Sequence, residues 1–462
     1  MTAAELKNSL FYKNENSFKI MSESDAKAAY DFCEEYKTFL DEAKTEREAV
    51  SKVVELAKAN GYTEFRPGTF YTEGTKVYYN NRGKSIILAV IGKRELSDGV
   101  KIAAAHIDSP RLDLKQNPLY EDNGLAMFKT HYYGGIKKYQ WTAIPLSLHG
   151  VIAKKNGEKV TVKIGEDDGD PVFVVSDLLP HLATEQMKET LAAGVKAEKL
   201  NILVGSRPFD DSDESDNIKL NIMNILHEKY DITEADFQSA ELEIVPAFKA
   251  KDVGLDRSMI GSYGHDDRVC AYPALMAILD TDTPEYTCVT VLTDKEEIGS
   301  DGNTGLNSSY LKYFIADLAT AAGLDPWTVL SASQCLSADV NSAFDPNYAD
   351  SFDGKNASYV NMGVCICKYT GSRGKSGASD ASAEFLGKIR NILDNAGVCW
   401  QTGELGKVDL GGGGTVAKYV ASLDIEVVDI GVPVLSMHAP YEVVGKADVY
   451  AAYRAFSEFF KS

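Results

Sequence analysis

Long apolar runs and an excess of basic residues are both missing from this sequence. No stretch approaches the ~20 apolar residues of a membrane helix. The first residues, "MTAAELKNSLFYKNENSFKIM", have no apolar region of signal-peptide length and no small-residue cleavage site. The 48 basic and 68 acidic residues give a formal charge of −20. We therefore expect a cytoplasmic protein with no membrane and no nucleic acid as a partner.

Paired cysteines are missing as well. The seven cysteines are scattered without a CxxC pair, which argues against a zinc–thiolate site and fits a reducing compartment. Cys365 and Cys367 are one strand period apart, so we expect them to pack on one face and not to bridge. With 44% hydrophobic and 25% charged residues, the composition is that of an ordinary globular protein.

The order of apolar patterns divides the chain into three parts. Residues 22–62 predict amphipathic helices that begin at a Ser22 cap, and strand-like runs follow to "GVKIAAAHID" at 99–108. From about 112 to 247 the pattern is β-like and rich in aromatic residues and glycine. Helices then alternate with strands again, including a strand predicted over 327–339. We predict an α/β protein whose mixed sheet, built from 1–110 and 248–462, is interrupted by a smaller strand-rich insertion at 111–247.

Side chains of the types that commonly bind metals follow several of the predicted strands. His106 ends "KIAAAH", Glu296 and Glu297 follow "CVTVL", Asp339 ends "SQCLSAD" and His438 ends "VPVLSMH". Ligands of open α/β sheets bind at the carboxyl ends of the strands. Imidazole and carboxylate ligands without thiolate suit Zn²⁺, Mn²⁺ or Co²⁺. The sequence thus favours a site for divalent ions at this edge.

Further acids leave alternatives open. Asp266 is a candidate bridge between two ions, but Asp266 and Asp267 could equally cap the helix that follows. Asp108 could accept the second N–H of the His106 imidazole or form a turn before "SP". Adjacent glutamates leaving a strand diverge, so one could be a ligand and the other a general base, unless both are solvated loop acids.

Five ordered stretches carry a family resemblance. "AAHIDSP", "DDRVCAYPALMAI", "DKEEIGS", "SADVNSAFDPNY" and "VPVLSMHAPYEVVGKADV" resemble the successive motifs of the M18 metallopeptidases, the aspartyl aminopeptidase and aminopeptidase I family. "YGGIK" and "LLPHLA" also resemble family stretches, and the likeness covers nearly the whole chain. It implies a zinc-exopeptidase-like catalytic domain and an aminopeptidase that acts on peptides.

The resemblance also implies roles for the strand-end residues. It implies two divalent ions, with zinc expected and manganese or cobalt as alternatives, bridged by Asp266 in preference to Asp267. The remaining ligands implied are His106 and Asp339 for one ion, and Glu297 and His438 for the other. Glu296 would be the general base, and Asp108 would orient His106.

Residues at the substrate and at subunit contacts are implied in the same way. His181 matches a histidine that in the family reaches a neighbouring subunit's active site, and the insertion is expected to make dimers that assemble into a dodecamer. Lys375 could offer a cation to an acidic side chain, although a lysine in such a loop is more often simply solvated. "DLGGGGTVAKY" lacks the ending of a nucleotide-binding P-loop, so we do not expect a nucleotide there. The family resemblance implies instead that Gly413, Gly414 and Thr415 line the peptide substrate.

Departures from the family pattern leave the preferred residue open. "AKTEREA", "QWTAIPL" and "KYTGSRGKSGASD" differ from the corresponding stretches of other members, the second and third from those of aspartyl-specific ones, so acidic and neutral N-terminal residues are both candidates. Two other functions are compatible with the fold: a metal-stabilised oligomeric scaffold, and a related di-metal carboxypeptidase or amidohydrolase. A glutamate at the position of the base argues against the scaffold.

Overall fold

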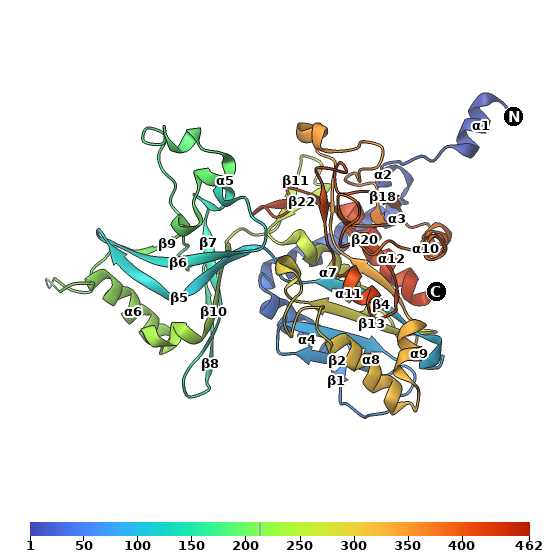
Figure 1. Ribbon diagram of the computed structural model, residues 1–462, viewed down its shortest axis with the longest axis horizontal. Helices are drawn as coiled ribbons and strands as arrows, with labels where there is room; N and C mark the ends of the chain where they lie inside the picture. Colours follow the sequence, from blue (N-terminus) through green and yellow to red (C-terminus); the bar gives the residue numbers. More distant parts are fainter. Residues whose placement is uncertain (212–213) are drawn as a thin grey trace.

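A nine-stranded mixed sheet forms the centre of the larger of two lobes (Figure 1). The computed structural model describes residues 1–211 and 214–462. Across the sheet the strands run β1 (Thr63–Glu64), β2 (Lys76–Asn81), β3 (Ser85–Val90), β13 (Thr287–Thr293), β4 (Val100–His106), β14 (Gln334–Ala338), β20 (Glu426–Gly431), β16 (Val364–Cys367) and β18 (Trp400–Thr402). Strands β13, β4, β14 and β20 are parallel, whereas β3 and β16 run antiparallel to their inner neighbours. The expected mixed α/β architecture is confirmed.

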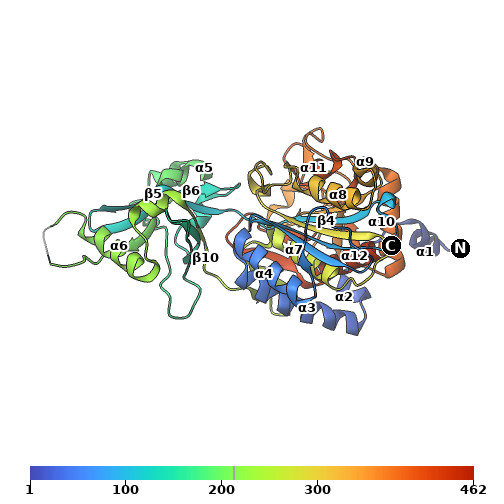
Figure 2. The same cartoon turned by 90° about the horizontal axis from the view of Figure 1, so that it is seen from below.

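Helices cover both faces of this sheet, as Figure 2 shows for α4 on one side and α8 on the other. One layer contains α3 (Glu23–Glu42), α4 (Glu46–Ala59), α7 (His265–Leu279), α10 (Ala383–Ala396) and α12 (Lys446–Lys461). The opposite layer contains α8 (Tyr310–Ala321), α9 (Pro326–Ser331) and α11 (Ala417–Ala421). Along β3, Ile86 and Leu88 pack against the first layer and Ile87 and Ala89 against the second. This two-sided burial explains why the strands read as continuous apolar runs.

The strand predicted over 327–339 is half wrong. Its first part is the helix α9, and β14 begins only at Gln334. Asp325 accepts a hydrogen bond from the backbone N–H of Thr328, and Pro326 occupies the first turn, where it needs no N–H donor. The cap lies outside the apolar run, so the apolar pattern alone could not separate a short helix from the strand that follows.

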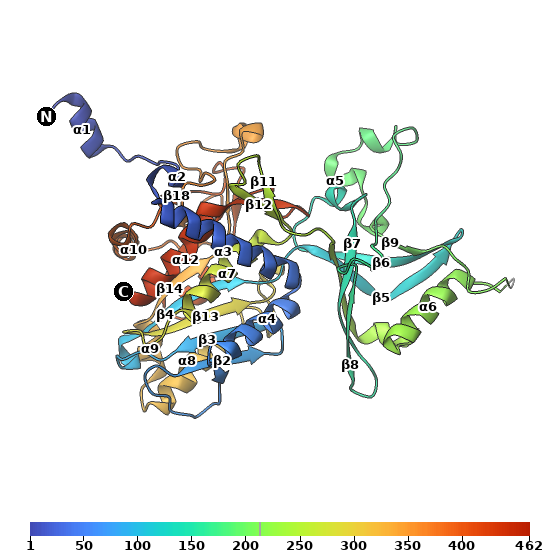
Figure 3. The same cartoon turned by 180° about the vertical axis from the view of Figure 1, so that it is seen from behind.

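The smaller lobe is built around a six-stranded antiparallel sheet. Its strands, in spatial order, are β8 (Lys159–Ile164), β7 (Leu146–Ala153), β10 (Ala240–Pro246), β5 (Arg111–Asp122), β6 (Leu125–Tyr133) and β9 (Ile202–Gly205). Helix α6 (Asn217–Tyr230) packs against it, and Trp141 is fully buried in its core. Figure 3 shows from behind how this lobe stands apart from the helices of the larger one.

A third sheet has five short strands. In spatial order these are β11 (Lys251–Val253), β12 (Met259–Ser262), β22 (Glu442–Gly445), β21 (Pro433–Leu435) and β15 (Asn341–Ser342). At the end of the molecule opposite the smaller lobe, α1 (Ala3–Leu10) projects from the body and has no buried residue (Figure 1). Among the described residues, no helix combines the length and the apolar character needed to cross a membrane.

Buried ion pairs join the two lobes. Lys44, in the loop between α3 and α4, lies with its Nζ 2.8 Å from Oε1 of Glu166, and each side chain is only 3% exposed. Arg111 stands at the start of β5. Its Nη1 lies 3.3 Å from Oε2 of Glu46 in α4, and its Nη2 lies 3.3 Å from Oε1 of Glu243 in β10. Because removing one partner would leave a buried charge unpaired, at a cost of about 3–5 kcal/mol, these contacts fix how the lobes meet.

Leu88→Ala should lower the free energy of unfolding by about 3 kcal/mol, because Leu88 is fully buried under the first helical layer. Leu255, which is fully exposed, is the matched control, and Leu255→Ala should change that free energy by less than about 0.5 kcal/mol. Guanidinium unfolding followed by circular dichroism measures both variants. Equal midpoints would contradict the packing described for β3.

Candidate metal centre

Three neighbouring parallel strands end at one place. His106 is the last residue of β4, Glu296 and Glu297 follow β13, and Asp339 follows β14. Strands β13 and β14 flank β4 directly, and their parallel register brings these ends to the same edge. His438 comes instead from the segment after β21, so it arrives from the five-stranded sheet and not from the main one.

Asp266, at the start of α7, lies between the two imidazoles. Its Oδ1 is 3.2 Å from Nε2 of His106, and its Oδ2 is 3.2 Å from Nε2 of His438. Each imidazole also faces a second carboxylate: Asp339 Oδ1 is 3.6 Å from His106 Nε2, and Glu297 Oε2 is 3.6 Å from His438 Nε2. The two imidazoles therefore share one carboxylate, and each has a further carboxylate of its own.

The donor atoms fit divalent cations. Nε2 of His106 and Oε1 of Glu297 are buried and make no hydrogen bond, although buried polar atoms are nearly always bonded. Two sets of donor atoms each lie within 4.8 Å of one another: His106 with Asp266 and Glu297, and His106 with Glu296 and Asp339. Nitrogen and carboxylate oxygen without thiolate are the ligands of zinc and of similar ions.

Asp267 has a different environment from Asp266, to which it is joined by a cis peptide bond. Its Oδ2 accepts a hydrogen bond from the backbone N–H of His106 at 3.3 Å, and burial raises the pKa of its carboxyl group well above the ordinary value. Only Asp266 stands between the imidazoles, so the geometry favours Asp266 as the shared ligand.

Backbone carbonyls set the tautomers of both imidazoles. Nδ1 of His106 donates to the carbonyl oxygen of Asp108 at 3.0 Å, with the Asp108 carboxylate slightly farther away at 3.4 Å. Nδ1 of His438 donates to the carbonyl oxygen of Gly135 at 2.7 Å. Since Nδ1 carries the proton in each ring, Nε2 is the nitrogen left to bind a cation.

Two buried carboxylates hold the backbone around the candidate ligands. Asp108 accepts the N–H groups of Glu296 at 3.1 Å and Glu297 at 3.2 Å. Glu442, in β22, accepts the N–H groups of Asp266 at 3.1 Å and His438 at 2.7 Å. Sequence reasoning missed Glu442, although an acid inside the apolar stretch "YEVVG" was a usable signal.

Like charges dominate the electrostatics of the centre. Burial lowers the pKa of His438, but Asp266 and Glu297 raise it by more, to about 11. Burial, together with the nearby Asp339 carboxylate, raises the pKa of Glu296 to about 8. Both shifts have the same origin, because too many carboxylates share a small space with too little positive charge.

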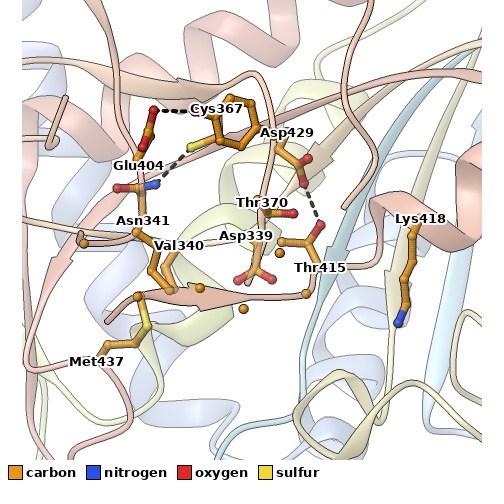
Figure 4. Close-up of a pocket in the computed structure, with 18 of the residues that line it drawn as sticks. Asp339, Val340, Asn341, Cys367, Thr370, Glu404, Thr415, Lys418, Asp429 and Met437 are labelled. Carbon is orange, nitrogen blue, oxygen red and sulfur yellow. Dashed lines mark hydrogen bonds between the residues drawn. The ribbon is translucent and has the colours of Figure 1, made fainter. Parts of the chain in front are cut away.

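A cavity of about 840 Å³ opens in front of these residues. Figure 4 shows part of its wall, where Thr415 is hydrogen-bonded to Asp429 at 2.6 Å and Asn341 donates to the Cys367 sulfur at 2.9 Å. Cys365 lies behind, with its sulfur 3.7 Å from that of Cys367, and both cysteines are free thiols.

Most of the residues expected at the substrate line this cavity. They are Lys375, Gly413, Gly414 and Thr415. The Nζ of Lys375 is 3.0 Å from Oδ2 of Asp380 and 3.8 Å from the centre of the Tyr369 ring, so its charge is already paired. His181 is exposed on the smaller lobe and is not among the described residues that line the cavity of its own chain.

Comparisons with known proteins point to one family of metalloproteases. The sequence signature of the family described as aminopeptidase I zinc metalloprotease (M18) matches residues 39–460. A probable M18 family aminopeptidase 1 of Clostridium acetobutylicum is 50% identical over 460 residues, which cover 98% of this chain and 99% of the relative. The crystal structure of an M18 family aminopeptidase from Thermotoga maritima superposes with a TM-score of 0.93 at 41% identity, covering 98% of this chain and 100% of that one.

A more distant structure shares the fold. The dodecamer of mApe1 from S. cerevisiae matches with a TM-score of 0.76 at 21% identity, covering 93% of this chain and 96% of that one. At this identity the likeness shows the fold alone.

Cation affinity should fall as the pH is lowered. The raised pKa of His438 means that at neutral pH its imidazole carries a second proton, on Nε2, which must leave before Nε2 can bind a cation. Competition with a fluorescent Zn²⁺ indicator at several pH values measures the apparent Kd. His438→Gln should flatten the pH dependence, whereas His227→Gln, which changes an exposed histidine of α6, should not. An affinity independent of pH would contradict the competition between a proton and a cation for His438.

Proposed function

Because the chain belongs to the M18 family of zinc metalloproteases, we propose that its strand-end residues hold a co-catalytic pair of divalent ions. The protein is a metalloaminopeptidase, a hydrolase of peptide bonds, as its close relatives are named. The observation that carries the proposal is the position of Asp266, whose two oxygens each lie 3.2 Å from a different imidazole. A shared carboxylate is what a two-ion site requires.

The ligands divide into two sets around Asp266. His106 and Asp339 would complete one ion, and His438 and Glu297 the other. Zinc is the expected metal, with manganese and cobalt as alternatives, because the donor set contains imidazole and carboxylate only. When bound, the ions supply Lewis acidity that polarises a peptide carbonyl and lowers the pKa of water.

Glu296 is the proposed general base. Its Oε2 lies 3.9 Å from Nε2 of His106, and the side chain faces the cavity. Glu296 takes a proton from the attacking water as the oxygen bonds to the scissile carbonyl carbon. It then delivers that proton to the leaving nitrogen as the C–N bond breaks, which returns the carboxylate to its starting state.

The cavity wall offers polar groups that a peptide substrate can contact. Gly413, Gly414 and Thr415 offer backbone and hydroxyl groups along one side. Lys375 can meet an acidic first side chain only by exchanging its contact with Asp380. A neutral first side chain leaves that ion pair in place, so acidic and neutral substrates can be compared directly.

The smaller lobe is the proposed contact between copies of this chain. A short segment around His181 exposes a run of large apolar side chains: Leu178, Leu179, Leu182, Met187 and Leu191. Such a cluster is typical of a surface that is covered in an assembly. We propose dimers through 111–247, and a dodecamer of such dimers by analogy with the yeast structure, with His181 reaching the cavity of a neighbouring copy.

Glu296→Gln should keep its bound metal and lose about 10²- to 10⁴-fold in kcat, because an amide cannot accept the proton. Asp266→Ala should lose metal as well, since both ion positions share that carboxylate. Aminoacyl-nitroanilides with acidic and large neutral side chains, assayed after reconstitution with Zn²⁺, Mn²⁺ or Co²⁺, measure turnover, and atomic emission measures metal.

The same panel, extended with N-acylated peptides, separates the competing functions. Full activity of Glu296→Gln would remove the assignment of the base. A wild-type protein that binds metal but cleaves no substrate would favour a scaffold. Cleavage of N-acylated peptides instead would favour a carboxypeptidase or amidohydrolase.

Mixed assemblies should test whether His181 acts in a neighbouring copy. His181→Ala and Glu296→Gln should each be nearly inactive alone. Co-expressed, they should regain activity, because some cavities then combine an intact Glu296 with an intact His181 from the other chain. His227→Ala in place of His181→Ala is the control and should be active on its own. No recovery in verified mixed assemblies would contradict action between copies.

A further inference from the structure

Tyr133, the last residue of β6, and the two glycines that follow it contact the candidate metal centre from the smaller lobe. Tyr133 donates a hydrogen bond from its hydroxyl group to Oδ2 of Asp108 at 2.8 Å. Gly135 accepts one from Nδ1 of His438 at 2.7 Å. Between them, Gly134 has a φ of +76°, and a Cβ built there would lie 3.2 Å from Oε2 of Glu297. The segment Tyr133–Gly135 therefore touches groups on both sides of the proposed ion pair.

Asp108 links Tyr133 to the two glutamates. Its Oδ2 accepts both the Tyr133 hydroxyl and the backbone N–H of Glu297, while its Oδ1 accepts the N–H of Glu296. Asp108 is fully buried, so its orientation depends on these protein donors and not on water. A rotation of this carboxylate would shift the turn that carries the proposed base and its neighbouring ligand.

Arg111 holds the Tyr133 ring in place. Arg111 and Tyr133 are paired across β5 and β6, and the guanidinium carbon lies 3.9 Å from the ring centre. Arg111 is itself only 5% exposed and is fixed by ion pairs with Glu46 and Glu243. The ring is thus clamped by the same buried charges that join the two lobes.

Gly135 acts on the opposite side of the centre. Its carbonyl oxygen fixes the plane of the His438 ring and leaves Nε2 directed at Asp266 and Glu297. Partners of this kind commonly change metal affinity or activity by about 10- to 100-fold when they are removed. Gly134 is the residue that lets the backbone pass this close to Glu297.

We propose that Tyr133 and Gly135 are positioning residues of the hydrolytic centre, through which the smaller lobe sets the orientation of Glu296, Glu297 and His438. This inference rests on the proposed function of those three residues. It makes β6 a part of the active site although its side chains provide no metal ligand. Neither residue touches the reacting atoms, so their effect passes through Asp108 and His438.

Tyr133→Phe removes only the hydroxyl group and keeps the ring under Arg111. We expect kcat to fall about 10- to 100-fold with KM changed less than about threefold. The absorption spectrum of the cobalt-substituted protein should also change, because the ligand turn is reoriented. Tyr132→Phe is the matched control, since Tyr132 is the adjacent tyrosine, is 39% exposed and stacks on His131, and it should match wild type in both measurements.

A second variant keeps the test independent of the first. Gly134→Ala places a methyl group against Glu297, so it should weaken cobalt binding and alter the same spectrum. Gly124 has a comparable positive φ in an open turn of this lobe, so Gly124→Ala should change neither cobalt binding nor the spectrum. Wild-type kcat and spectrum in Tyr133→Phe, or equal losses in Tyr132→Phe, would overturn the proposal. If wild-type protein cleaves no aminoacyl substrate, the proposed function fails, and the cobalt spectra still decide the positioning role.

Discussion

The sharing of one carboxylate by two imidazoles places unusual demands on everything around it. Asp266 faces both His106 and His438, and the carboxylates of Glu296, Glu297 and Asp339 crowd the same space. Like charges at this separation repel strongly where water is excluded. The proposed divalent cations would relieve that repulsion and satisfy the buried donor atoms of His106 and Glu297 that make no hydrogen bond. The raised pKa values of Glu296 and His438 express the same imbalance.

The protein tolerates this crowding because strands and hydrogen bonds fix the backbone of the proposed ligands. The three adjacent strands deliver His106, Glu297 and Asp339 on a rigid edge. Glu442 and Asp108 then bind the backbone N–H groups next to the ligands, so the chain cannot relax away from the repulsion. Three sheets meet at this point, and each contributes contacts that the other two do not provide. Metal affinity at this centre would therefore depend on the whole arrangement and not on the proposed ligands alone.

The sequence predicts contacts that depend on short-range patterns and misses those that depend on tertiary structure. Apolar runs followed by His or acid reveal strand ends, and Ser22 marks the start of α3, where its side chain caps the helix. The α9 helix was missed because its cap lies before the apolar run. Tyr133 was missed because the tertiary structure brings it from the smaller lobe to Asp108. Glu442 was missed because it accepts hydrogen bonds from backbone N–H groups, which carry no sequence signal, so its place inside "YEVVG" was the one available hint.

The position of the smaller lobe has a consequence for assembly. Its strand β6 contacts the metal centre at one end, while the loop around His181 exposes apolar side chains elsewhere on the same lobe. Buried ion pairs through Arg111 make the lobe stiff where it joins the larger one. A contact between copies that displaced this lobe would therefore also shift the positions of Asp108 and His438, because no flexible hinge lies between them in the part of the chain that the structure describes. In such an arrangement, assembly and the geometry of the centre are coupled by rigid packing, and a loss of one weakens the other.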